Sequence, residues 1–300
     1  MKSKFVLAIV LCFTCSTYSF AWKVMYKPKK KIVLYDISFQ EGMFKEYYKT
    51  GLNLEDMRAI NPDADLLKKD FSGYDSYDGA NNERVKTYTI QAGFQLNGKD
   101  NLFHRLNPML CVGLTYFAQI NYTNYYMKSN TITGIDTIVL PNNFGKAYLD
   151  SSYGEGTSTD YYFNQTRIDA SLIVSYYKSA PWSIYAGVGF SVGSSLYCHS
   201  QVRYGTHNTT YLRLPTGEST NAISSHDSGS SQVYINKRNL GVSVFIPAGF
   251  DFRIGNRNRF FEHFHLFAEI KPGLNFLIIR GVKTISNFYL QKGIGFKYSF

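Results

Sequence analysis

Long apolar runs are scarce in this chain: after residue 21 no stretch approaches the length of about eighteen apolar residues that marks a membrane-spanning helix. A spanning helix needs about 20 such residues, so helices cannot carry the mature chain across a bilayer. A closed barrel is the remaining spanning structure, because it leaves no backbone group unpaired in lipid. Aromatic residues make up 17% of the chain, which suits a wall with aromatic side chains at both interfaces.

Cysteine is also scarce, with four residues in 300, and only Cys111 and Cys198 follow the expected cleavage site. An exported protein could pair them. The strand layout given below places them on non-adjacent strands, on opposite faces of the wall and near opposite rims. We therefore expect no intramolecular disulfide.

The first 21 residues have the pattern of a signal peptide. Lys2 and Lys4 precede an apolar run from Phe5 to Cys15, and Ser19 and Ala21 are small residues at the positions that a signal peptidase reads. A single anchoring helix is the alternative, but the run is about half the length it needs. We expect the mature chain to begin at Trp22.

Positive charge exceeds negative charge by 10 over the whole chain. Five lysines lie in residues 22–31, which we expect to form a basic periplasmic tail that is attracted to anionic lipid headgroups. Basic runs also bind nucleic acid, but an exported chain rarely meets it and no nucleic-acid motif follows. Nucleic acid is therefore not an expected partner.

Period-two alternation of apolar and polar residues predicts eight strands. They are Ile32–Phe44, Val85–Leu96, Arg105–Tyr126, Asn164–Tyr177, Ser183–Arg203, Asn236–Ile254, Glu262–Ile279 and Ser286–Phe300. The first strand is expected to turn Val33, Tyr35, Ile37 and Phe39 outward, and the third to do so as far as Ile120 and Tyr122. No Lys or Arg is expected on the apolar face of the second to seventh strands, and Lys292 in the eighth is the exception, with a stem able to snorkel.

Long and short connections alternate along the chain. The long ones are Lys45–Arg84, Met127–Phe163 and Tyr204–Ile235, and all are expected to be surface loops. In the first loop, Asn53 can cap a short helix over Leu54–Ile60. The third loop is rich in Gly, Ser, Thr and Asn and is expected to be mobile. The pattern predicts an all-β, eight-stranded antiparallel transmembrane barrel with long surface loops and short periplasmic turns.

The last strand ends flush with the carboxyl terminus, and its outward face carries Phe296, Tyr298 and Phe300. This ending resembles the insertion signal of outer-membrane barrels. Over residues 32–300 the chain resembles the small barrels of the OmpA/OmpX kind and the PorT-like kind of Bacteroidetes. The resemblance implies residence in the outer membrane of a Gram-negative bacterium, contact with its lipid, and insertion by the barrel-assembly machinery. It implies no particular activity, since one barrel fold serves many functions.

Charged residues and histidines on the inward face form a candidate polar network in the lumen. Its members are Asp36, Arg167, Asp169, Asp251, Arg253, His263, His265, Glu269, Lys271 and Lys297. Eight strands leave a lumen only wide enough for side chains, so opposite charges should pair and plug it. A gated narrow pore is the alternative. His263 and His265 could hold a transition metal, but two ligands without a third favour a hydrogen-bonded pair, and no metal or cofactor is expected.

Surface-rim residues His199, Ser200, His207, His226 and Asp227 are the candidates for hydrolytic chemistry, which needs a nucleophile, a base and an orienting group within reach of one another. No G-x-S-x-G element occurs. The sequence favours a non-enzymatic barrel that binds through its surface loops or serves as a component of a larger secretion or uptake complex. The alternatives are a barrel enzyme acting on lipid A or peptides, and a narrow pore.

Overall fold

The computed structural model describes residues 32–47, 52–79, 84–96, 106–139, 145–177, 182–214, 216–255 and 261–300. The expected signal peptide, residues 1–21, and the expected basic tail, residues 22–31, lie outside the described residues, so both stay predictions.

Eight antiparallel strands close into a ring. They are β1 (Val33–Tyr47), β3 (Val85–Gln95), β4 (Leu106–Val139), β5 (Lys146–Tyr177), β6 (Trp182–Arg213), one strand made of β8 (Leu240–Phe245) and β9 (Ala248–Arg253), β10 (Phe264–Ile278) and β11 (Ile285–Ser299). The ring closes because β11 pairs with both β10 and β1. The predicted fold, an eight-stranded antiparallel barrel, is confirmed.

The stagger of the barrel can be followed along one row of lateral neighbours. The row runs Lys86, Met43, Lys292, Ile270, Ala248, Ala186, Val174, Pro108 and Leu96. It leaves β3 at residue 86 and returns at residue 96, a stagger of ten residues. Ten residues of a strand tilted by about 40° rise about 25 Å, which is the height of the apolar band of such barrels. Lys86 therefore lies about 25 Å above Leu96, which borders a short turn.

The outward face of the ring is mostly apolar. Ile168, Phe190 and Leu266 are each more than half exposed, whereas their inward neighbours are buried and mostly polar. Lys86 is exposed on this same face, so the expectation that the second strand carries no outward Lys was wrong. A closed ring with an apolar exterior is one of the two structures that can span lipid, and the protein resides in the outer membrane of a Gram-negative bacterium.

Two irregularities turn residues inward that the sequence placed elsewhere. The pairing of β4 with β5 shifts between Phe117 and Ile120, where Gln119 has a φ of 47°. The shift reverses the alternation, so Ile120 and Tyr122 are buried inside rather than exposed to lipid. A second shift occurs in the pairing of β5 with β6, where Asn164 pairs with Tyr197 and Gln165 with Ser195. The alternation on β6 reverses there, so Cys198 faces inward and is buried.

Both described cysteines thus face the interior, and the prediction that they face opposite sides was wrong. Each is a free thiol. Cys111 packs with Met109, Ile173 and Tyr185, and Cys198 belongs to a separate cluster where the barrel passes into the strands beyond it.

Two further strands depart from the predicted pattern. The predicted sixth strand is interrupted at residues 246–247, because Pro247 has no N–H to donate to a neighbour. At the start of β1, a register shift between Leu34 and Asp36 moves Tyr35 against the buried Cys111 cluster, so Tyr35 does not face lipid as predicted.

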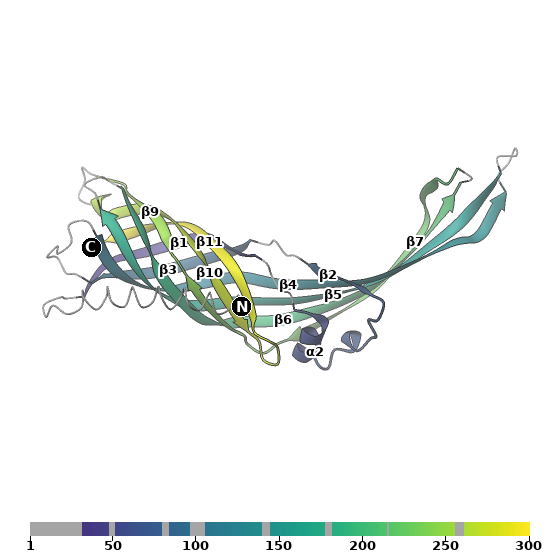
Figure 1. The fold of residues 1–300 in the computed structure, drawn as a ribbon, viewed down its shortest axis with the longest axis horizontal. Helices are drawn as coiled ribbons and strands as arrows, with labels where there is room; N and C mark the ends of the chain where they lie inside the picture. Colours follow the sequence, from purple (N-terminus) through teal and green to yellow (C-terminus); the bar gives the residue numbers. More distant parts are fainter. Residues whose placement is uncertain are drawn as a thin grey trace, which may run out of the picture.

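Two of the three long connections are strand rather than loop. β4, β5 and β6 continue past the ring, and β7 (Ser219–Ile235) pairs with β6 from His199 to Arg213. They form a four-stranded sheet in the order β4, β5, β6, β7 that projects beyond the barrel, to the right in Figure 1. We call the parts of these strands in residues 120–139, 146–164, 197–213 and 219–235 the projecting sheet. The expected mobile third loop is a paired hairpin within it.

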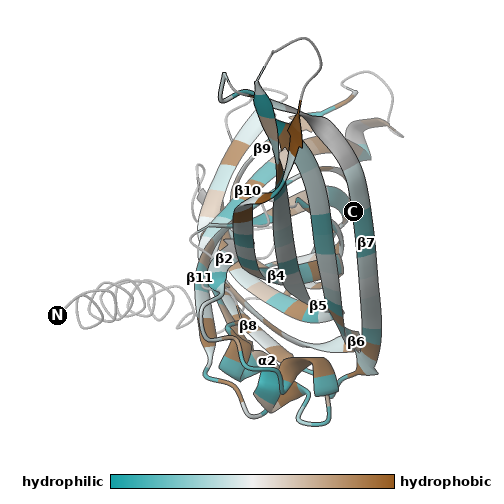
Figure 2. Cartoon of the chain, turned by 90° about the vertical axis from the view of Figure 1, so that its right-hand side faces the viewer, coloured by the Kyte–Doolittle hydropathy of each residue, from teal (hydrophilic) through white to brown (hydrophobic). Residues whose placement is uncertain are grey.

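The first long connection folds over the mouth of the barrel. It contains α2 (Leu54–Ile60), the short 3-10 helix Asp65–Leu67 and β2 (Asp75–Gly79), which pairs with β4 at residues 123–127. The predicted helix is confirmed: Asn53 accepts from the Asp56 N–H at 2.8 Å, and Asp56 accepts from the Asn53 N–H at 3.1 Å. Figures 1 and 2 show α2 beneath the strands where the barrel passes into the sheet. We call residues 52–79 the mouth cap.

No helix among the described residues is long and apolar enough to cross a membrane.

Candidate functional site: the closed lumen and the projecting sheet

The lowest part of the lumen, near the short turns, holds four interacting residues. Lys297 forms an ion pair with Asp251 and lies 3.9 Å from Asp36. On the other side of Asp251, His265 contacts its carboxylate through Nδ1 at 2.6 Å. Asp251 and His265 are almost fully buried. These four predicted residues come together as one network of both charge signs.

The middle of the lumen holds a second group. Lys271 Nζ lies 3.0 Å from Glu269 Oε1, and the Tyr185 hydroxyl donates to Glu269 Oε2 at 3.1 Å. Asp169 accepts from the hydroxyl of Thr115, which lies on the neighbouring strand. Lys271 and Glu269 are two residues apart on β10 and share the inward face, so their pairing follows from the strand period.

Arg167 fills the upper part of the lumen. Its side chain is 1% exposed, its guanidinium lies 4.7 Å from the centre of the Phe117 ring, and its Nε donates to Gln165 at 2.7 Å. Close by, Glu46 accepts from the Tyr122 hydroxyl at 2.9 Å and from the Asn275 amide at 2.6 Å. Polar side chains therefore fill the barrel along its axis.

The remaining two predicted members lie at the short-turn rim and are only half-buried. They are Arg253 and His263, whose Nδ1 lies 2.7 Å from the Ser299 carbonyl oxygen. His263 and His265 therefore each have a partner within the chain. The described residues contain no group of three His, Cys, Asp or Glu side chains that could hold a metal ion.

Sequence reasoning missed several members of the network. Glu46 lies just past the predicted end of the first strand, and Tyr122 was assigned to the lipid face because the bulge could not be seen. Tyr185 and Gln165 were on the expected inward face but are uncharged. A search for long polar side chains on that face would have found both.

The lumen is closed at its upper end as well. Leu52, Met57 and Leu67 of the mouth cap are each 1% exposed and pack in one cluster with residues of the barrel such as Phe44 and Phe117. Lower down, between Asp36, Tyr185 and Lys297, a cavity of about 30 Å³ remains, with room for about two water molecules. The described part of the chain thus encloses a packed interior rather than a channel.

Buried hydrogen bonds fasten the mouth cap to the sheet. Asn61 Oδ1 accepts from the Ser200 hydroxyl at 2.9 Å and from the Asn236 amide at 2.7 Å. Within the cap, Arg58 donates to the backbone carbonyls of Leu67 and Lys69. Ser200, a candidate nucleophile from the sequence, is therefore a buried anchor for the cap.

An ion pair joins the far side of the cap to the inner face of the sheet. Lys69 Nζ lies 2.6 Å from Glu155 Oε2, and both contact the Tyr204 hydroxyl, which donates to Glu155 at 2.9 Å. The hydrogen bond from Lys69 lowers the pKa of the Glu155 carboxyl from 4.5 to about 2. We call this ion pair the cap latch.

Cross-strand polar contacts stiffen the projecting sheet. Asp160 on β5 accepts from Thr123 of β4 and from Arg203 of β6, each at 2.5 Å. Nearer the tip, Asp150 pairs with Arg213 at 2.8 Å and accepts from the Gly134 N–H at 2.7 Å. Each carboxylate joins three strands, so the sheet is held as a unit beyond the barrel.

One predicted pair of catalytic candidates does meet on this sheet. His207 Nδ1 lies 2.5 Å from Asp227, and Nε2 contacts the hydroxyl of Thr209 two residues along the same strand. The order hydroxyl, imidazole and carboxylate is that of a nucleophile, a base and an orienting group. However, the His207 and Asp227 side chains are 56% and 74% exposed, so solvent surrounds the chain of bonds. Water is therefore not excluded from these side chains, and their electrostatic interactions are not strengthened as they are in a buried catalytic site.

The predicted insertion signal lies at the lower rim. Phe296 and Phe300 are more than half exposed, and the ring of Tyr298 contacts those of Phe264 and Phe300 edge-on. The Phe300 N–H donates to the Tyr35 carbonyl oxygen at 2.8 Å, so the last residue is still paired with β1. How the chain is inserted stays a prediction.

Comparison with known proteins gives only a general likeness. No family model matches the chain, and no curated protein matches it. Among solved structures, the alignment with Neisserial surface protein A covers 90% of this chain and 99% of that protein's chain, at 10% sequence identity and a TM-score of 0.34. The attachment invasion locus protein Ail of Yersinia pestis, in complex with the heparin analogue sucrose octasulfate, covers 89% of this chain and 100% of its own, at 8% identity and a TM-score of 0.24. Similarity this low says nothing about function. The strand pairing itself shows that the fold is a barrel.

Proposed function

We propose that this protein is a non-enzymatic outer-membrane barrel that binds a molecule outside the cell through its projecting sheet. The observation that carries the proposal is the sheet itself, in which β4, β5 and β6 continue beyond a ring whose lumen is filled and β7 adds a fourth strand. Because the lumen is closed, a molecule that binds this protein must bind to its outer surface. The sheet is braced by the mouth cap and by cross-strand ion pairs, so its faces are presented in a fixed shape.

The composition of the sheet supports a binding role. In residues 146–163 of β5, eleven of 18 residues are Tyr, Ser, Thr or Gly. Tyr supplies rigid amphipathic contact area and the small hydroxyl residues supply adaptable hydrogen bonds, which is the chemistry of antibody binding surfaces. Tyr125 and Tyr153 are 45% and 41% exposed, one on each face. Figure 2 shows the strands of the sheet coloured largely pale and teal, with brown in short stretches.

The edges of the sheet are a second means of binding. Among the described residues, β2 covers β4 only at residues 123–127, and β7 pairs with β6 alone. The outer edges of β4 beyond residue 127 and of β7 thus offer backbone groups to which an extended segment of another chain can add. This supports the related proposal that the barrel works as a subunit of a larger envelope complex. Membership of the PorT-like barrels rests on the terminal strand and is likewise a proposal.

A truncated chain tests the binding proposal. Replacing residues 130–153 and 207–227 each by Asn-Gly joins Ser129 to Gly154 and Thr206 to Ser228 through tight turns, and keeps the cap latch. Both chains are probed on arrays of glycans and of purified extracellular proteins. We expect the truncated chain to keep the heat-modifiable mobility of a folded barrel and to lose the binding of the intact chain. Equal binding by the two chains would contradict the proposal.

A further inference from the structure

Charged side chains on the outward face of the ring are confined to one sector. Among the described residues they are Glu41 and Lys45 on β1, Lys86 on β3 with Arg84 just before it, and Lys292 on β11. The outward residues of β8, β9 and β10, and of β4, β5 and β6 within the ring, carry no charge. The sector has four positive charges and one negative charge, so an anion is the chemistry it favours.

Pairing brings these side chains close to one another. Met43 is the lateral neighbour of both Lys86 and Lys292, so the two lysines flank one residue, about 10 Å apart between Cα atoms. By the same register, Lys45 and Arg84 lie one step further up the wall, in the next row that faces outward. The long side chains of these four residues can reach a common ligand.

The height of the sector matches the upper membrane interface. Lys86 lies about 25 Å above Leu96 at the short-turn side, which is about the height of the apolar band of such barrels. Lys45 and Arg84 lie further up the strands, and Lys292 lies slightly lower because the row descends from β3 to β11. A lysine at the bilayer midplane costs about 2–4 kcal/mol but only about 0–1 near an interface. The ion pairs of the described residues do not include Lys45, Lys86 or Lys292, and Lys45 lies 5.1 Å from the ring centre of Tyr47.

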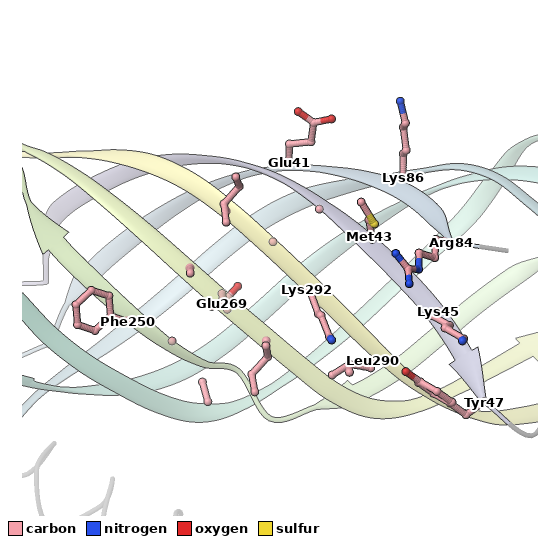
Figure 3. A pocket seen from close by; sticks show the side chains of 17 residues that line it. Glu41, Met43, Lys45, Tyr47, Arg84, Lys86, Phe250, Glu269, Leu290 and Lys292 are labelled. Atoms are coloured by element: carbon pink, nitrogen blue, oxygen red, sulfur yellow. The ribbon is translucent and has the colours of Figure 1, made fainter. Parts of the chain in front are cut away.

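A hollow in the wall lies next to the basic side chains. Its volume is about 900 Å³, and besides the charged residues it is lined by Ala248, Ala268, Phe250, Ile270 and Ile294. The two alanines are small outward residues on neighbouring strands, and the larger apolar side chains beside them form its sides. Figure 3 shows Lys86 and Glu41 projecting from the wall, Arg84 and Lys45 near the ends of their strands, Lys292 in the middle of β11, and Phe250 further along the hollow.

We propose that this sector is a binding site for the phosphorylated, acylated lipid of the outer leaflet. Its phosphates bind at Lys45, Arg84, Lys86 and Lys292, and an acyl chain lies along the apolar part of the hollow. An inorganic anion would satisfy the basic end alone, whereas an apolar trough that continues into the membrane matches a lipid. Basic clusters at membrane interfaces bind lipid headgroups in this way, with about 1 kcal/mol for each Lys or Arg near the surface.

The test compares two variants with the same change of charge. The site variant combines Lys45→Gln, Arg84→Gln, Lys86→Gln and Lys292→Gln. The control variant combines Lys237→Gln, Arg238→Gln, Arg280→Gln and Lys283→Gln, which are exposed residues of the connections at the outer rim. Native mass spectrometry of each detergent-solubilised barrel measures binding of purified bisphosphorylated lipid A, with inorganic phosphate as a competitor. Heat-modifiable mobility confirms that each variant is folded.

We expect the intact chain and the control variant to bind one lipid A with similar affinity, and the site variant to bind at least about tenfold more weakly. Millimolar inorganic phosphate should not displace the lipid, because it lacks the acyl chain. Equal binding by the site variant, or an equal loss in the control variant, would overturn the proposal. Complete displacement by inorganic phosphate would overturn it too, by assigning the cluster to a free anion. A protein that co-purifies with the intact chain and prevents lipid binding would also count against it.

Discussion

At the scale of single residues, the interior of the barrel is governed by the cost of burying charge. Each buried carboxylate of the lower and middle lumen lies against a cation or a hydroxyl donor, as Glu269 does with Lys271 and Tyr185. A buried pair contributes little net stability, but one partner left alone is strongly destabilising. The lumen residues therefore act as a set whose members depend on one another.

A single and a double variant of this pair test that dependence. Lys271→Met leaves Glu269 without its cation in a site where both side chains are at most 6% exposed, and we expect it to cost about 3–5 kcal/mol of unfolding free energy. Adding Glu269→Gln should recover most of the loss, because the amide still accepts from Tyr185. Urea unfolding in detergent micelles measures both variants. A double variant as unstable as Lys271→Met alone would refute the pairing.

At the scale of elements, the sequence predicted the strands of the ring well because lipid on one side and a packed lumen on the other enforce a strict alternation. Phe190 and Ser191 show it, as one is exposed to lipid and the next is buried. The alternation could not reveal where the register slips. The bulge at Gln119 adds a residue without changing the polarity pattern around it, so Tyr122 was placed on the wrong face.

The projecting sheet was missed for a related reason. Residues 146–163 are rich in Ser, Thr, Gly and Tyr on both faces, which is also the composition of a solvated loop. Their strand structure depends on pairing with β4 and β6, which are distant in sequence, and on contacts such as that of Asp160 with Thr123 and Arg203. The polar network was largely predicted, because its residues stand out on an inward face, but their partners depend on the stagger of the barrel.

The cap latch predicts how the mouth cap responds to acid. The pKa of Glu155 is about 2 in the folded protein, below its ordinary 4.5, so the ionised carboxylate stabilises the closed cap. This stabilisation is complete above pH 4.5 and is lost as the pH falls from 4.5 to 2. Hydrogen exchange of residues 52–79, corrected for the intrinsic pH dependence of exchange, should rise over this window.

Lys69→Met provides the control for the latch. It removes the partner that lowers the pKa of Glu155, so the cap of this variant should exchange faster at pH 5 and show little further change on acidification. An intact chain whose cap exchange is flat between pH 4.5 and pH 2 would show that the ion pair does not hold the cap.

At the scale of the whole molecule, the protein consists of two parts, the ring and the projecting sheet. The ring presents an apolar band with one basic sector to the membrane and fills its own lumen. The sheet extends from the same strands beyond the ring, and the mouth cap packs at the junction of the two (Figure 1). Continuity of β4, β5 and β6 through both parts means that the rigid barrel fixes the direction in which the sheet points.

Site-specific photo-crosslinking in living cells tests this division most directly. A benzophenone amino acid is placed at Tyr125 or Tyr153 on the sheet, and at Ile168 or Phe190 on the wall, four positions between 41% and 58% exposed. Because the sheet is the proposed binding part, we predict adducts with a macromolecule at the sheet positions and none at the wall positions. Adducts confined to Ile168 and Phe190, with none at Tyr125 or Tyr153, would contradict the account.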